Sequence, residues 1–190
     1  MPQNKIVAVT GGIGSGKSTV MNILKTNNKL CVSCDELNSK LLKDANYLIG
    51  LERLFPYAFI NGKFDKPKLK ERIFTDEAER KKLNSYSHCM IKSKLTEELK
   101  KISDSDVFVE VPILNQTDFE SIFDEIWVVT SDKNLREKRI SVRDSVNTDF
   151  ANKIISTQTD EYVFSKPTKF IFNNGSIVEL ENQINGLLNT

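Results

Sequence analysis

The stretch VTGGIGSGKSTV, residues 9–20, decides the fold of this 190-residue chain. Within it, Gly11, Gly16, Lys17 and Ser18 satisfy the pattern G-x-x-x-x-G-K-[S/T]. Glycines in such a loop allow successive backbone N–H groups to turn inward around an anion. The stretch therefore predicts a loop that holds nucleotide phosphates, with Lys17 at the β- and γ-phosphates and the Ser18 hydroxyl on Mg²⁺.

The residues on either side of the loop fit this interpretation. The preceding run, Lys5–Thr10, is apolar and β-branched, as a buried strand requires. After the loop, Val20, Ile23 and Leu24 follow at helical spacing. A strand, a glycine-rich loop and a helix therefore follow one another, and the helix N-terminus adds its own N–H groups to the phosphate site.

The composition narrows the class of partner. The chain has 27 basic and 26 acidic residues, so it lacks the basic excess that nucleic-acid binding usually requires. No apolar run approaches the roughly 20 residues that cross a bilayer, and the hydrophobic segment near the start is too short for a secretory signal. We therefore expect no nucleic-acid partner, no membrane association and a cytoplasmic location.

The three cysteines form no disulfide framework. Cys31 and Cys34 form a C-x-x-C pair, and His88 with Cys89 could complete four zinc ligands by residue type. The segment LCVSCD, residues 30–35, reads as a strand, on which side chains three apart point to opposite faces. We therefore expect apolar packing of these cysteines, with a metal or redox site as the alternative.

The chain alternates between strands and helices, which predicts an α/β fold with a buried parallel sheet. Five short runs rich in β-branched or aromatic residues are the expected strands: Lys5–Thr10, Leu30–Ser33, Val107–Val111, Glu125–Val129 and Lys169–Phe172. The long charged segment between the second and third strands predicts an inserted helical subdomain that builds a substrate site. A second helical stretch, between the fourth and fifth strands, suits a mobile cover over phosphates or, alternatively, a solvated surface.

Asp35 follows the second expected strand. The carboxyl ends of parallel strands share one edge of a sheet, so Asp35 is expected at the same crevice as the phosphate loop. A carboxylate there can orient an attacking hydroxyl or accept its proton. A residue that caps the next helix is the equally open alternative.

Several segments, in order and spacing, resemble the dephospho-coenzyme A kinases. They are IVAVTGGIGSGKSTV at 6–20, VSCDEL at 32–37, LKERIF at 69–74, SHCMI at 87–91, VEVPIL at 109–114, RISVRD at 139–144 and FIFNNG at 170–175. The resemblance implies transfer of the γ-phosphoryl group of ATP to the 3′-hydroxyl of dephospho-coenzyme A, with Mg²⁺ as cofactor. We expect a monomer or a weak homo-oligomer.

The resemblance also implies a P-loop three-layer sandwich with five parallel strands in the order 2-3-1-4-5. The expected core comprises residues 1–42, 103–132 and 168–190. A helical coenzyme A subdomain is expected at about 43–102 and a helical lid at about 133–167.

The resemblance assigns roles to individual residues. Asp35 matches a catalytic base, His88 a structural or substrate-contacting residue, and Asn173 lies near the expected adenine position. Glu110 could hold Mg²⁺ through water, with an exposed edge residue as the alternative. The residues expected to bind ATP lie along the loop: Gly12, Gly14, Ser15, Gly16, Lys17, Ser18 and Thr19.

The sequence departs from the family pattern in several motifs. Ser33, Cys89 and Asn115-Gln116 replace residues typical of the family, and Glu161 and Phe164 occupy the positions of two lid arginines.

Lid arginines normally neutralise charge on the transferring phosphoryl group. Arg139 and Arg143, four apart on an expected helix, are the replacement candidates, with Lys166 in reserve. A surface ion pair of Arg143 with Asp144 or Glu137 is the alternative.

Two other functions remain open from the sequence. One is a different small-molecule kinase on the same scaffold, such as a nucleoside or nucleotide kinase. The other is a nucleotide-binding relative that lost turnover together with its lid arginines.

Overall fold

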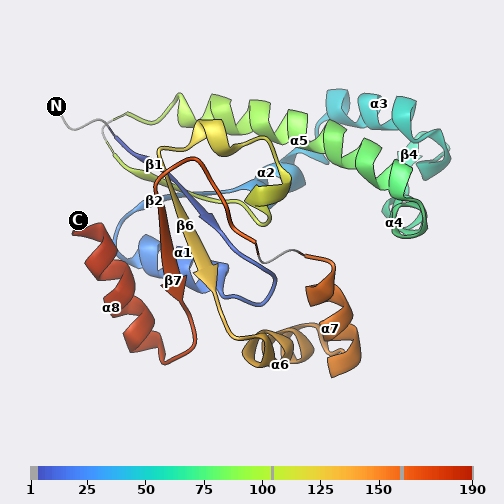
Figure 1. Ribbon diagram of the computed structural model, residues 1–190. Helices are drawn as coiled ribbons and strands as arrows, with labels where there is room; N and C mark the ends of the chain where they lie inside the picture. The colour runs from blue at the N-terminus through green and yellow to red at the C-terminus, as the bar shows by residue number, and fades with distance from the viewer. Residues whose placement is uncertain (1–3, 104, 159–160, 190) are drawn as a thin grey trace. The chain divides into compact units, whose positions relative to one another are not determined.

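A five-stranded parallel sheet forms the centre of the first of two compact units (Figure 1). The computed structural model describes residues 4–103, 105–158 and 161–189. The sheet has the order β2-β5-β1-β6-β7, which confirms the expected order. Its strands are β1 (Ile6–Thr10), β2 (Leu30–Ser33), β5 (Val107–Glu110), β6 (Glu125–Thr130) and β7 (Thr168–Phe172). Each of these five strands was predicted to within one residue at each end.

Helices α1 (Lys17–Thr26) and α8 (Ile177–Leu188) cover one face of this sheet. Alternate strand residues supply the core, so Val7 and Val9 belong to the cluster under these helices while Ala8 faces the other side. Trp127 of β6 lies in the same cluster, with its ring 5.1 Å from that of Phe108. The predicted apolar strands and the helix after the loop therefore bury one continuous core.

Helices α6 (Lys133–Asp144) and α7 (Thr148–Ser156) follow β6 and belong to the same unit. Ser145 ends α6 in the left-handed conformation at φ 54°. The Asn147 side chain then accepts the backbone N–H of Phe150 and caps α7. A small apolar cluster of Ile140, Ala151 and Ile155 joins the two helices.

The second compact unit spans Cys34–Lys101, whereas the helical subdomain was expected at about 43–102. It holds α2 (Cys34–Leu41), α3 (Ala45–Leu54), α4 (Lys66–Thr75) and α5 (Glu77–Leu99). Three of these helices begin after an aspartate whose carboxylate accepts a backbone N–H of the first turn: Asp44, Asp65 and Asp76. The first unit comprises Met1–Ser33 and Ile102–Thr190.

A β-hairpin within the second unit was not predicted. It pairs β3 (Phe59–Ile60) with β4 (Lys63–Phe64), and the rings of Phe59 and Phe64 lie 5.3 Å apart. Asn61 and Gly62 form the turn with φ of 50° and 72°, the left-handed values that a tight hairpin turn needs. The Asn-Gly pair was the available signal in the sequence.

Short 3₁₀ turns complete the chain at Pro56–Ala58, Leu114–Gln116 and Glu120–Ile122. No helix among the described residues is both long and apolar enough to cross a membrane.

The expected strand through LCVSCD is wrong in its last two residues, because helix α2 already begins at Cys34. Cys31 lies in β2 and its thiol donates to the backbone carbonyls of Lys29 and Met21. Burial raises the pKa of this thiol. The charge of Lys25 lowers the pKa by a smaller amount, and the charge of Glu110 raises it. All three cysteines are free thiols, and Cys34 is buried.

A buried carboxylate stands at the start of β6. Glu125 accepts a hydrogen bond from Trp127 Nε1 at 2.6 Å and forms ion pairs with Lys169 at 3.1 Å and Lys5 at 3.4 Å. Burial by itself would raise the pKa of Glu125, but the hydrogen bonds from Trp127 and Lys169 and the two positive charges together lower it. The carboxylate is therefore more stable in the folded chain than in the unfolded chain.

We expect Glu125→Gln to lower the free energy of unfolding by about 1–3 kcal/mol near neutral pH, because hydrogen bonds to a charged group are lost. A lowered folded-state pKa gives stability that is complete above the unfolded value, about 4.3, and is lost as pH falls through the folded value. Urea unfolding at several pH values should therefore show the variant approaching the wild type in acid. The exposed Glu181→Gln serves as control, and a gap that does not depend on pH would contradict this role of the charge.

Candidate functional site

The loop between β1 and α1 has the backbone that its glycines predict. Gly11, Gly14 and Gly16 have φ of 145°, 76° and 98°. A Cβ on Gly16 would lie 2.0 Å from Asn173 Nδ2, and one on Gly14 would lie 2.9 Å from the backbone oxygen of Arg136. Both the backbone conformation and the close neighbours therefore require glycine.

Lys17 opens α1, and its ammonium group lies on the loop itself. Its Nζ donates to the carbonyl oxygens of Gly11 at 2.7 Å and Gly12 at 3.1 Å. The positive charge is thus held over the glycines at the N-terminus of α1, where the helix dipole also favours an anion.

The two expected Mg²⁺ residues lie together. Ser18 Oγ donates to Glu110 Oε1 at 3.5 Å, and Glu110 ends β5 beside Val9 of β1. A hydroxyl and a carboxylate are hard oxygen ligands of the kind that Mg²⁺ prefers. In the described ranges, no three His, Cys, Asp or Glu side chains gather as a metal site. A Mg²⁺ ion held by Ser18 and Glu110 would need nucleotide phosphates and water as its other ligands.

Side chains from α6 and from the end of β7 bind the outward carbonyls of the loop. Arg139 donates to the carbonyl oxygens of Gly14 at 3.3 Å and Ser15 at 3.4 Å, and also to Ser131 Oγ and the Asn173 carbonyl. Asn173, which is buried, donates from Nδ2 to the Ser15 carbonyl at 2.8 Å. Arg139 and Asn173 thus lie at the loop and contact its backbone. The contact of Asn173 with adenine stays a prediction.

One residue of this group, Arg136, was not predicted from the sequence. Arg136 is 4% exposed, and its Nε donates to the Ile13 carbonyl at 2.9 Å. Its position three residues before Arg139 on the same helix was the available signal, because residues at that spacing share a helix face.

Arg143 has a different partner from Arg139. Its Nε and Nη2 donate to the two carboxylate oxygens of Asp144 at 2.8 and 2.7 Å, and the side chain is exposed. The hydrogen bond to Asp144 raises the pKa of Arg143, and the same bond lowers the pKa of Asp144. This is the ion pair that the sequence analysis named as the alternative. Lys166, the reserve candidate, donates its backbone N–H to Glu120 at 3.2 Å.

Asp35 and His88 both belong to the second unit. Asp35 is the second residue of α2 and is exposed, so it lies inside the first turn and not at the N-cap position. His88 lies half-buried on α5. The capping alternative for Asp35 is therefore wrong, and its catalytic role stays a prediction.

The second unit also contains an apolar cavity of about 230 Å³. Tyr47 and Ser87 line it, and their hydroxyls lie 3.0 Å apart. Lys66 and Lys70, four apart on α4, add positive charge to the lining. Its other lining residues are Asn38, Leu42, Leu51, Phe64, Leu69, Ile73 and Leu83.

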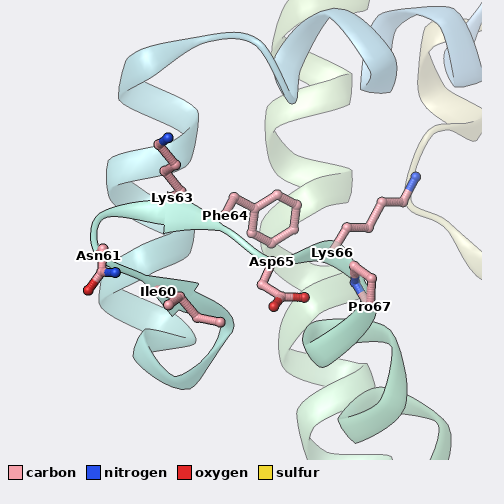
Figure 2. A pocket seen from close by; sticks show the side chains of 7 residues that line it. All are labelled: Ile60, Asn61, Lys63, Phe64, Asp65, Lys66 and Pro67. Carbon is pink, nitrogen blue, oxygen red and sulfur yellow. The ribbon is translucent and has the colours of Figure 1, made fainter.

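A second, open pocket of about 570 Å³ lies around the β3–β4 hairpin (Figure 2). In Figure 2 the side chains of Lys63 and Lys66 extend to either side of the Phe64 ring. Phe64 and Lys66 line both pockets. The second unit thus has an apolar cavity. This cavity shares Phe64 and Lys66 with the open pocket, which also contains Lys63.

Comparisons with known proteins agree with this geometry. The dephospho-CoA kinase family model matches residues 5–179. The dephospho-CoA kinase of Streptococcus agalactiae serotype III is 31% identical over 188 residues, which cover 95% of each chain. A crystal structure of a Thermus thermophilus protein has a TM-score of 0.83 and 27% identity over 98% of both chains. The dephospho-CoA kinase from Campylobacter jejuni, at 24% identity and a TM-score of 0.72, shares the fold over 98% of this chain and 96% of its own.

The family model covers most of the chain, including the phosphate loop, Asp35, His88, Glu110 and Asn173. The strand order and the loop geometry are those expected from the same resemblance. This chain therefore belongs to the dephospho-CoA kinase family.

Proposed function

We propose that the chain transfers the γ-phosphoryl group of ATP to the 3′-hydroxyl of dephospho-coenzyme A, giving coenzyme A and ADP. The observation that carries the proposal is the glycine-constrained loop with Lys17 and the Ser18–Glu110 pair, in a chain of this family. In this reaction the 3′-oxygen of the acceptor forms a new bond to the γ-phosphorus. The bond between the γ-phosphorus and the bridging β-phosphate oxygen breaks, and the acceptor hydroxyl loses its proton.

The first unit holds the residues that we assign to ATP. The loop N–H groups and the N-terminus of α1 bind the phosphates, and Lys17 exchanges its carbonyl partners for phosphate oxygens. When bound, Mg²⁺ would neutralise phosphate charge. Ser18 would ligate it directly and Glu110 through water.

The second unit holds the residues that we assign to the acceptor. Asp35 orients the 3′-hydroxyl and accepts its proton, and His88 contacts the substrate. The cavity suits the long pantetheine arm because most of its lining is apolar. The Tyr47–Ser87 hydroxyl pair is available to the amide groups of the arm, and Lys66 and Lys70 are available to the pyrophosphate. The charge of the substrate and that of the lysines are complementary.

Arg139 and Arg143, two of the three arginines of α6, receive different roles. Arg139 donates to five acceptor atoms: two loop carbonyls, Ser131 Oγ and two oxygens of Asn173. We therefore assign it to orientation of the loop. Arg143 is the candidate for the charge that develops on the transferring phosphoryl group, since its guanidinium is exposed and can exchange Asp144 for phosphate.

Purified protein with ATP, Mg²⁺ and dephospho-coenzyme A should release ADP and yield a product one phosphoryl group heavier by mass spectrometry. Lys17→Ala should abolish turnover and so exclude a contaminating kinase. AMP offers the same 3′-hydroxyl without the pantetheine arm and should be a much poorer acceptor. Turnover of nucleosides or nucleotides in preference would favour a different kinase, and ATP binding without acceptor-dependent ADP release would favour a non-catalytic relative.

Asp35→Asn keeps size and hydrogen-bonding capacity but removes charge and basicity, so we expect kcat to fall by about 10²- to 10⁴-fold with little change in ATP affinity. Glu36→Gln is the matched control, because Glu36 is the next exposed carboxylate in the same helical turn. Steady-state kinetics and ATP titration measure both effects. Equal kcat values for the two variants would remove Asp35 from the mechanism.

Arg143→Ala should lower kcat sharply and affect the KM for ATP only modestly, as expected for a cation that acts in the transition state. Asp144→Asn releases the guanidinium without removing it, so this variant should keep kcat. A wild-type kcat in Arg143→Ala would leave only a surface ion pair, worth under about 1 kcal/mol to stability.

A further inference from the structure

Ile13, in the middle of the phosphate loop, is bound through both of its backbone polar groups. Its N–H donates to Gln158 Oε1 at 2.7 Å, and its carbonyl accepts from Arg136 Nε at 2.9 Å. Arg136 belongs to α6, and Gln158 follows the last turn of α7. One loop residue is thus hydrogen-bonded to both helical segments.

The side chain of Ile13 makes a third connection. It packs against the apolar cluster of Ile140, Ala151 and Ile155 that joins α6 to α7. Next to it, Gly14 approaches the Arg136 backbone so closely that a Cβ on Gly14 would lie 2.9 Å from the Arg136 carbonyl oxygen. The helix pair and the middle of the loop therefore pack as one body.

These contacts determine how the loop presents its N–H groups. Rotation of the peptides that flank Ile13 would break the bond to Gln158 or the bond to Arg136, so the loop conformation and these two bonds depend on one another. The loop conformation and the docking of the α7 end are thus the same structural state. Any ligand that requires that loop conformation also stabilises the docked helix, and the coupling is reciprocal.

We infer that Gln158, together with Arg136, is a positioning residue that couples nucleotide binding at the phosphate loop to the docking of α7. The inference rests on the proposed function only in that ATP binds at the loop. We propose no contact between Gln158 and phosphate. It acts through the Ile13 peptide, so that α7 is docked when the nucleotide is bound and the loop is ordered when α7 is docked.

Gln158→Leu removes the acceptor at nearly constant size, whereas Gln158→Glu keeps an acceptor oxygen for the Ile13 N–H. We expect titration calorimetry with ADP to show about 5- to 50-fold weaker binding for the leucine variant and near wild-type binding for the glutamate variant. Gln183→Leu is the matched control: Gln183 accepts the backbone N–H of Phe172 in the same unit instead of that of a loop residue, so its loss should not change affinity for ADP.

Amide hydrogen exchange gives a second readout. In the wild type, ADP should slow exchange at residues 148–156, and this protection should disappear in Gln158→Leu and return in Gln158→Glu. A merely structural role would lower the melting temperature without removing the ADP dependence of α7 exchange.

The outcomes separate the two proposals. Failure of the wild type to bind ADP would refute the proposed function. If the wild type binds ADP but ADP does not slow amide exchange in α7, the coupling is overturned. This test needs no variant. Equal ADP affinity of Gln158→Leu and wild type would overturn it as well.

Discussion

Several backbone N–H groups must converge on one point, and that constraint governs the first unit. A chain that turns its N–H groups inward must turn its carbonyls outward, where each one needs a donor. Glycines at positive φ make the turn possible, but they leave the loop without side chains to hold it. Arg136, Arg139 and Asn173 supply donors to the carbonyls of Ile13, Gly14 and Ser15. The phosphate loop is therefore a surface that the rest of the unit stabilises from behind.

The topology places the residues that we propose for the nucleotide and those that we propose for the acceptor in different units. The parallel sheet brings β1, β5 and β7 together, so Thr10, Glu110 and Phe172 end at one edge although they are distant in sequence. The residues assigned to the nucleotide leave from these strand ends. Asp35 and His88, which we propose for the acceptor, instead belong to the helical unit, which has its own cavity.

The strands and the loop could be predicted because their signals are local. VTGGIGSGKSTV determines the turn, and the strand runs alternate between the two faces of a buried sheet. The hairpin at Asn61–Gly62 was missed because its strands have only two residues each, too few for a period. Arg136 was missed because its partner, the Ile13 carbonyl, is 123 residues away in the chain. The spacing of Arg136 and Arg139 places both on one face of α6 but does not show which loop carbonyl Arg136 contacts. Arg143 is the opposite case, since its observed partner is the next residue.

The ammonium group of Lys17 is fixed on the loop by the backbone of the chain. Two carbonyl oxygens hold it, and the side chain is half-buried. A free lysine side chain carries about 2 kcal/mol of rotamer entropy. Here that entropy is lost when the chain folds, because two backbone acceptors fix the side chain. The position of this positive charge is therefore set by folding of the loop itself.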